Sequence, residues 1–115
     1  MTNITNLRVF EDSIEFVRLI HALKVGRGYG DLVNQLRRAA VSVGSNIAEG
    51  AGLGSDAGFV RHLKIARGSV NEAEAQLNML QAIGLIEAEA EAIQLSRAIG
   101  KQLTRLIQYL DGGGG

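Results

Sequence analysis

Residues 59–80 carry the pattern that most constrains the fold of this chain. Apolar side chains recur there at alternating steps of four and three residues, at Phe59, Leu63, Ala66, Val70, Ala73, Leu77 and Leu80. On an α-helix these steps keep every member on one face, and three heptads of them are typical of knobs-into-holes packing. The segment is therefore predicted to be a long helix. Other helices are needed to cover its apolar face.

The ends of this helix carry recognisable signals. Ser55 is a favourable N-cap, because its hydroxyl can accept a hydrogen bond from a backbone N–H group of the first turn. Gly84 suits the left-handed residue that commonly follows a helix, and Leu85 would then contact Leu80. These signals predict a helix that begins after residue 55 and stops before residue 84.

Helical periodicity recurs in three other segments, at residues 7–24, 31–50 and 88–110. In the first of them, one predicted seam consists of Phe10, Ile14, Val17 and His21, widened by Val9, Phe16, Ile20 and Leu23. Asp31 is the predicted N-cap of the second helix.

No strand is predicted, because no alternation of apolar and polar residues extends over six positions. The chain has no proline to interrupt a helix, and glycine-rich stretches separate the helical segments. We therefore predict an all-α, up-down-up-down antiparallel four-helix bundle. It forms a single domain over residues 1–111, followed by a flexible glycine tail at 112–115.

Composition narrows the possible functions. Lys plus Arg equals Asp plus Glu at 12 each, so the chain lacks the overall basic excess typical of nucleic-acid-binding modules. Cysteine is absent, which excludes disulfides and thiolate metal ligands and is compatible with a reducing compartment. No apolar run is long enough to predict a membrane span, and the N-terminus lacks the layout of a signal peptide. We expect a cytoplasmic protein without a membrane partner.

Catalytic and metal-binding patterns are weak. Neither His21 nor His62 has the glutamate three residues earlier that di-metal sites of helix bundles use. Glu72 and Glu74 lie 200° apart around a helix, so their carboxylates cannot converge on one substrate. The glycine-rich stretches lack the spacing of a phosphate-binding loop. The sequence thus predicts no enzyme activity, no cofactor and no metal.

The second predicted helix has two distinct sides. Leu32, Leu36, Ala39, Ala40, Val43 and Ile47 form an apolar stripe that suits the bundle core. The opposite stripe contains Arg38, Ser42, Ser45 and Glu49, flanked by Val41, Gly44 and Ala48. Small residues with a few polar groups allow another backbone to approach closely. We therefore interpret the outer stripe as a surface for self-assembly; its alternative is an ordinary solvated face.

Polar residues of the third helix complete the predicted surface. Glu72 and Gln76 are one turn apart and project from the same side. The predicted subunit-interface residues are Arg38, Val41, Ser42, Ser45, Asn46, Glu49, Glu72 and Gln76.

Two alternatives remain open from the residues alone. A local basic patch of Arg37, Arg61, Lys64 and Arg67 is the best candidate for contacting the phosphates of RNA or DNA, although no aromatic residues interleave with it to stack on bases. A helical adaptor for another protein is the third hypothesis.

The residues 37–42, Arg-Arg-Ala-Ala-Val-Ser, and 45–50, Ser-Asn-Ile-Ala-Glu-Gly, resemble the four-helix-bundle family of 23S rRNA intervening-sequence proteins. That group includes the accessory variability determinant of diversity-generating retroelements. A second match consists of Phe59, Leu63, Ala66, Gly68, Ser69, Glu72, Glu74, Gln76 and Leu77. The resemblance covers about residues 7–110.

This resemblance implies a small cytosolic bundle that assembles into a ring of five, a homopentamer. It also implies no known enzymatic activity. Some members are encoded within ribosomal RNA insertions, and the retroelement relatives bind a reverse transcriptase and nucleic acid through a basic surface. The zero net charge of this chain departs from those basic relatives.

Overall fold

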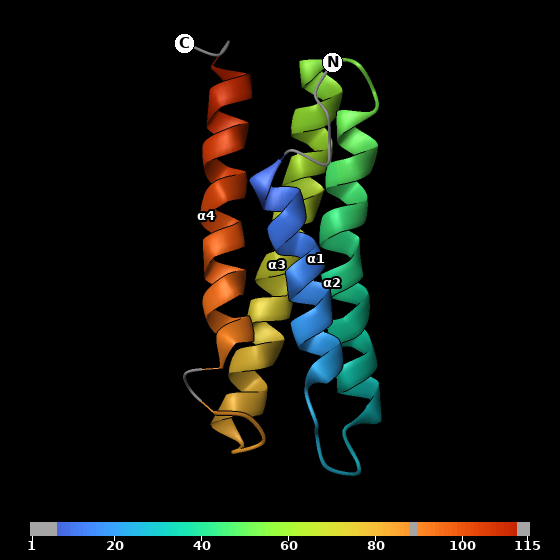
Figure 1. The fold of residues 1–115 in the computed structure, drawn as a ribbon, viewed down its shortest axis with the longest axis vertical. Helices are drawn as coiled ribbons and strands as arrows, with labels where there is room; N and C mark the ends of the chain where they lie inside the picture. The colour runs from blue at the N-terminus through green and yellow to red at the C-terminus, as the bar shows by residue number, and fades with distance from the viewer. Residues whose placement is uncertain (1–6, 88–89, 113–115) are drawn as a thin grey trace.

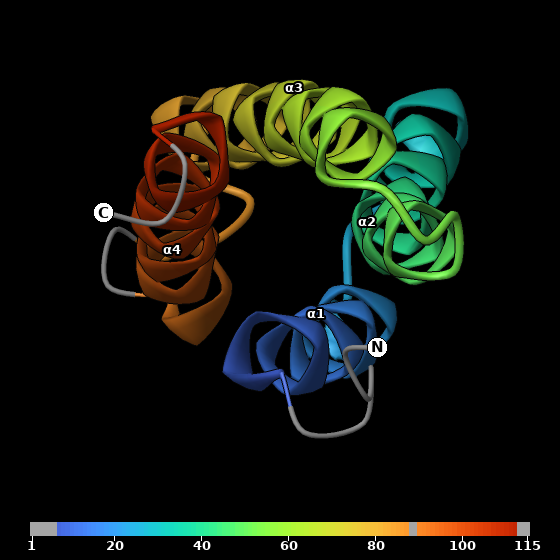
Figure 2. The ribbon, with the colours of Figure 1, turned by 90° about the horizontal axis from the view of Figure 1, so that it is seen from above.

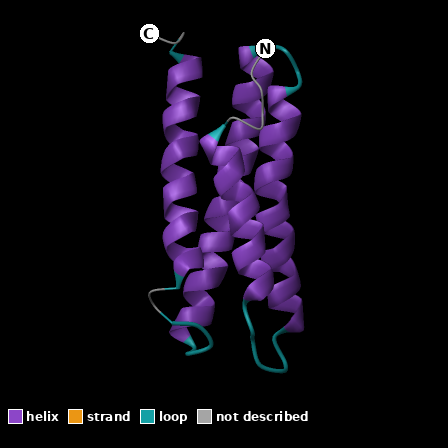
Figure 3. Ribbon diagram, viewed as in Figure 1, coloured by secondary structure: helices purple, strands orange, loops and turns teal. Residues whose placement is uncertain are grey.

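The computed structural model of the chain describes residues 7–87 and 90–112. These residues form four helices: α1 (Arg8–Ala22), α2 (Gly30–Ala51), α3 (Asp56–Ala82) and α4 (Glu91–Asp111). Figure 3 shows that helices and connecting loops account for the described chain, with no strand among these residues. The predicted all-α class with four helices is confirmed.

The helices pack around a common centre, each against two neighbours. Packing joins α1 to α2, α2 to α3, α3 to α4 and α4 back to α1, as Figure 2 shows from above. The connections before and after α2 lie at opposite ends of the molecule (Figure 1). The resulting bundle measures 46 × 21 × 20 Å along its principal axes.

Helix α3 matches its prediction closely. All seven residues of the predicted seam are buried. The Ser55 hydroxyl accepts a hydrogen bond from the Gly58 N–H at 3.1 Å, as expected of an N-cap. Gly84 has a φ of +80°, and the Leu85 N–H donates to the Leu80 carbonyl at 2.9 Å, which closes the helix in a Schellman motif.

Helix α1 faces the core with a different side from the predicted seam. Its buried residues are Val9, Ser13, Phe16 and Ile20, whereas Ile14 and His21 are exposed. The predicted seam was therefore wrong at Ile14 and His21, whereas Val9, Phe16 and Ile20, which were predicted to widen it, are buried. Ser13 can point inward because its hydroxyl donates to the Phe10 carbonyl at 2.6 Å, so the buried oxygen needs no water.

The start of α2 also differs from the prediction. Tyr29 is the N-cap residue and makes no side-chain hydrogen bond to the helix, and Asp31 lies inside the first turn. The prediction of Asp31 as the N-cap was wrong. Its carboxylate still lies near the positive end of the helix dipole, which favours a negative charge there. The N-cap of α4 is Ala90; the residues 88 and 89, where that helix was expected to begin, lie outside the described residues.

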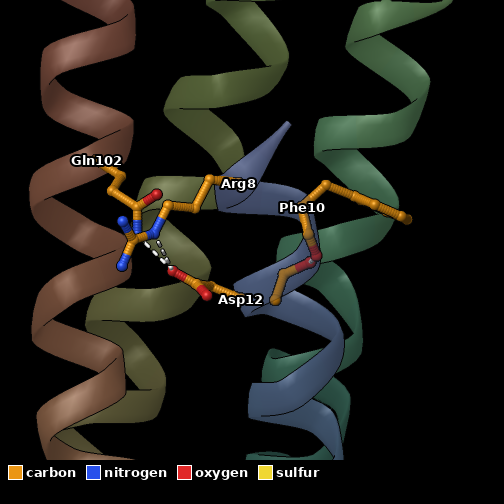
Figure 4. Close-up of polar contacts among 5 residues, drawn as sticks. Arg8, Phe10, Asp12 and Gln102 are labelled. Atoms are coloured by element: carbon orange, nitrogen blue, oxygen red, sulfur yellow. Dashed lines mark hydrogen bonds and ion pairs between the residues drawn. The ribbon is translucent and has the colours of Figure 1, made fainter. Parts of the chain in front are cut away.

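A polar contact ties the outer edge of α1 to α4. The Gln102 side-chain amide donates to Asp12 Oδ2 at 2.7 Å, and Arg8 Nε lies 3.8 Å from the same oxygen (Figure 4). The Asp12 carboxylate thus joins α1 to α4 through a residue 90 positions away in the sequence. The opposite side of α1 faces α2.

Candidate assembly surface

A groove runs between the outer sides of α1 and α2. It has a volume of about 360 Å³ and is lined by Phe10, Ser13, Ile14, Val17, Val41, Gly44, Ser45 and Ala48. After Val41, the α2 side contributes only small residues, and the α1 side contributes the large apolar ones. The groove is therefore apolar, and its α2 wall allows close approach of another chain.

The apolar character of this groove extends to the molecular surface. Ile14 is 54% exposed and Val41 is 47% exposed. These two side chains belong to different helices but line the same groove. Their exposure leaves a continuous apolar surface that a partner could cover.

The structure divides the predicted subunit-interface residues of α2 into two parts. Arg38, Val41, Ser45 and Glu49 are exposed, whereas Ser42 and Asn46 are half-buried. Among the described residues, no ion pair involves Arg38 or Glu49. Ser42 and Asn46 keep part of their surface exposed while they contact other residues of the same chain.

Ser42 and Asn46 belong to a polar contact between α2 and α3. The hydroxyls of Ser42 and Ser69 lie 2.8 Å apart, and the Asn46 amide nitrogen donates to the Ser42 carbonyl at 2.9 Å. His62 Nδ1 lies 3.1 Å from Asn46 Oδ1. Because this amide oxygen can only accept, Nδ1 carries the proton in this contact.

Sequence reasoning did not identify His62 and Ser69 as partners of the stripe. The two residues are seven positions apart on α3, and each precedes a residue of the apolar seam by one position, Leu63 and Val70. A polar residue that recurs beside a heptad seam is the signal that could have indicated a polar junction with a neighbouring helix.

Glu72 and Gln76 also occupy different environments. Glu72 is exposed, but Gln76 is only 5% exposed within the single chain. The Gln76 amide nitrogen lies 3.5 Å from both Gln35 Oε1 and Glu72 Oε1. Gln76 therefore packs between α2 and α3 of one chain, whereas the Glu72 side chain is exposed at the molecular surface.

Three of the four residues of the predicted basic patch, Arg61, Lys64 and Arg67, lie on α3. Arg61 and Lys64 line a shallow pocket on α3 together with Ile65, and Lys64 Nζ lies 3.9 Å from Asp111 Oδ2. Arg67 points to α4, where Nη1 lies 3.5 Å from the Thr104 hydroxyl.

Arg37 is separated from the other three basic residues. The contacts of Gln35 with Gln76 and of Asn46 with His62 fix the antiparallel register of α2 and α3. In that register, Arg37 lies level with the C-terminal half of α3, whereas Arg61 lies in the N-terminal half. Arg37 instead lines a pocket at the α1–α2 connection.

Residues 7–87 and 90–112 contain no group of three or more His, Asp or Glu side chains arranged to hold a metal ion. Within the same residues, no helix combines the length and the apolar composition needed to cross a bilayer.

Residues 5–107 match the model of the 23S rRNA-intervening sequence protein family. A crystal structure of a protein of unknown function from the S23 ribosomal protein family of Bacteroides thetaiotaomicron is similar, with a TM-score of 0.77 and 29% identity over 87% of this chain and 98% of that one. No curated protein matches. With its family model spanning nearly all of the four helices, the chain belongs to the 23S rRNA-intervening sequence protein family.

Proposed function

We propose that this protein is a non-enzymatic bundle that assembles with copies of itself, and that the α1–α2 groove is the acceptor surface. The observation that carries the proposal is the apolar groove, with Ile14 and Val41 each about half exposed. An exposed apolar surface of this kind commonly marks an interaction site. The loops at alternate ends of the molecule support an up-down-up-down order for the bundle (Figure 1).

A second stripe of the chain complements the groove. Arg61, Ile65, Gly68 and Glu72 recur at steps of four, three and four along α3, so they share one helix face. All four are exposed, and Ile65 is 43% exposed. The exposed stripe of α2 has matching spacing, with Arg38, Ser45 and Glu49 on one face.

The two stripes match in height along the bundle. Ser42 contacts Ser69, so the part of α3 around Ile65 and Gly68 lies level with the groove. In a closed ring whose axis runs along the bundle, each subunit uses two different surfaces at the same height. We therefore place Ile65 of one copy in the α1–α2 groove of the next.

The charges of the two stripes are complementary in this arrangement. The register places Glu72 at the height of Arg38 and Arg61 at the height of Glu49, on either side of the apolar contact. No described residue forms an ion pair with any of these four side chains within the chain. Opposite charges at both ends would fix the register of the two helices and disfavour wrong alignments.

A charge reversal tests this pairing. Sedimentation velocity at roughly micromolar concentration should detect an oligomer for the wild type. Arg38→Glu should release smaller species, and adding Glu72→Arg should restore the oligomer. Ser45→Arg should also dissociate it, because a long charged side chain would enter the groove.

The matched control is Lys101→Glu, an exposed charge on α4 outside both stripes, which should leave the mass unchanged. A wild type that sediments at the 12.2 kDa mass of one chain would contradict the proposal. The ring of five is supported by the family resemblance, and it predicts a native mass about five times that of the chain.

Binding of RNA or DNA is the alternative function. It has less structural support, because Arg37 lies apart from Arg61 and Lys64, and Arg67 contacts Thr104. Filter binding over a salt series tests it, since phosphate contacts weaken steeply as salt rises. If the wild type retains RNA or DNA on the filter at low salt and Arg61→Gln abolishes that retention, the result would favour nucleic-acid binding over a role of Arg61 in assembly.

A further inference from the structure

A second pocket lies at the C-terminal end of α1. It is formed where the end of α1, the connecting segment 23–29 and the start of α2 meet, at the lower end of Figure 1. Its volume is about 470 Å³. Small-molecule sites in proteins commonly have volumes of roughly 300–1,000 Å³, so this pocket is large enough to hold a small ligand.

Three cations and no carboxylate line this pocket. The cations are Lys24, Arg27 and Arg37. Among the described residues, none of the three forms an ion pair. Because the whole chain has zero formal charge, this local excess is not a consequence of a generally basic protein.

Arg37 lines the pocket from helix α2, and its side chain is half-buried. Its Nε atom is buried and has no hydrogen-bond partner among the described residues. A buried N–H group without a partner destabilises the folded chain, and most such groups in proteins are satisfied. Arginine presents its N–H groups in a planar fork that matches the oxygens of a phosphate group.

The number of cations indicates the charge of the ligand. A single carboxylate would balance only one of the three positive charges, whereas an anion with two or more phosphate groups carries enough negative charge to balance all of them. We propose that the pocket binds a small phosphorylated anion, of the size of pyrophosphate or a nucleoside diphosphate. Arg37 holds it from the α2 side, and Lys24 and Arg27 hold it from the connecting segment. This proposal does not depend on the assembly proposed above.

Titration calorimetry with pyrophosphate at low ionic strength tests the proposal. We expect saturable binding with one site per chain, weakened by added salt. Lys24→Gln and Arg27→Gln should each weaken binding by about tenfold, and Arg37→Gln by more, because it removes a bidentate contact. Lys24 and Arg27 are exposed, so their variants keep the test valid if Arg37→Gln does not fold.

The matched control is Lys101→Gln, an exposed cation on α4 that lies outside the pocket lining and should alter affinity less than about twofold. Bound pyrophosphate should also slow tryptic cleavage after Lys24 and Arg27. Absence of saturable heat at millimolar pyrophosphate, or equal weakening by Lys101→Gln, would overturn the proposal.

A second arm separates a small ligand from a nucleic-acid strand. Titration with single-stranded oligouridine measures whether the protein binds phosphate groups that belong to a nucleic-acid strand. Pyrophosphate binding that oligouridine does not displace supports the small-ligand pocket. Oligouridine binding that requires Arg27, together with no pyrophosphate binding, would overturn it in favour of a nucleic-acid contact.

Discussion

The hydroxyl of Ser13 lies beside the Cα of Gly44 so closely that a Cβ added to Gly44 would be 2.8 Å from Ser13 Oγ. Real Cβ atoms do not approach other atoms so closely. The hydroxyl is held in place by its 2.6 Å hydrogen bond to the Phe10 carbonyl, and both Ser13 and Gly44 are buried. This pair sets how near α1 and α2 approach at the apolar groove.

Gly44→Ala should destabilise the protein, because the new methyl group displaces the Ser13 hydroxyl from its hydrogen bond. We expect a net loss of about 1 kcal/mol in the free energy of unfolding, after the helix-favouring effect of alanine is included. Chemical denaturation measures the change.

The same substitution in a Ser13→Ala background should behave differently. The remaining Cβ of residue 13 would lie 3.6 Å from the new methyl group, an ordinary van der Waals distance. There, Gly44→Ala should stabilise the chain by about 0.5–1 kcal/mol through helix propensity. Equal effects in the two backgrounds would show that Ser13 does not limit the approach.

A second close approach joins the end of α2 to α3 at Gly50. A Cβ on Gly50 would be 2.7 Å from His62 Cβ and 3.1 Å from Phe59 Cδ1. Because neither neighbour is the free end of a flexible chain, Gly50→Ala should cost about 2–3 kcal/mol and lower the melting temperature clearly.

Gly100→Ala is the matched control for that prediction. Gly100 lies inside α4, and the nearest atom to an added Cβ is Val70 Cγ1 at 3.9 Å. The substitution should therefore stabilise the chain by about 0.5–1 kcal/mol. Destabilisation by Gly100→Ala comparable to that of Gly50→Ala would mean that the distances do not explain the difference.

Asn46 should matter for stability through its contacts with Ser42 and His62. Asn46→Ala removes these contacts and leaves the His62 Nδ1–H without its acceptor, so we expect a loss of about 1–3 kcal/mol in urea denaturation. Asn34→Ala, at an exposed position of the same helix, should change stability by less than about 0.5 kcal/mol. Similar losses for both variants would contradict the importance of the polar junction.

The Glu15 carboxyl should titrate at lower pH than an ordinary glutamate. The Arg18 guanidinium donates hydrogen bonds to the carboxylate and thereby lowers the pKa of Glu15. Since the folded-state pKa is lowered, the contribution to stability is present at neutral pH and is lost as the pH falls through that pKa.

Carbon-detected NMR titration of the Glu15 side chain measures this shift. Arg18→Gln should return the pKa towards the ordinary glutamate value. An unchanged titration in that variant would assign the shift to another cause.

Local sequence signals were sufficient where a helix depends on its own residues. The seam of α3 from Phe59 to Leu80 was predicted completely, because its heptad steps define one apolar face whatever surrounds it. The cap at Ser55 and the stop at Gly84 were also predicted, since both depend on backbone groups within a few residues. The family was indicated by the residues that follow Arg37 on the second helix.

Tertiary packing decided what the local pattern left ambiguous. Helix α1 has apolar residues on several sides, and the close approach of Ser13 to Gly44 selected the face with Ser13 over the predicted seam through Ile14. Ser42 was expected on the outer face of α2, yet it contacts Ser69, because the direction from which α3 approaches is a property of the whole bundle.

The charged groups show the same division. The amino-acid sequence alone specifies four amphipathic helices with balanced charge, because periodicity and composition are local properties. Only the antiparallel register brought Arg38 level with Glu72 and carried Arg37 away from Arg61, since residues far apart in sequence are placed by the packing of side chains between helices.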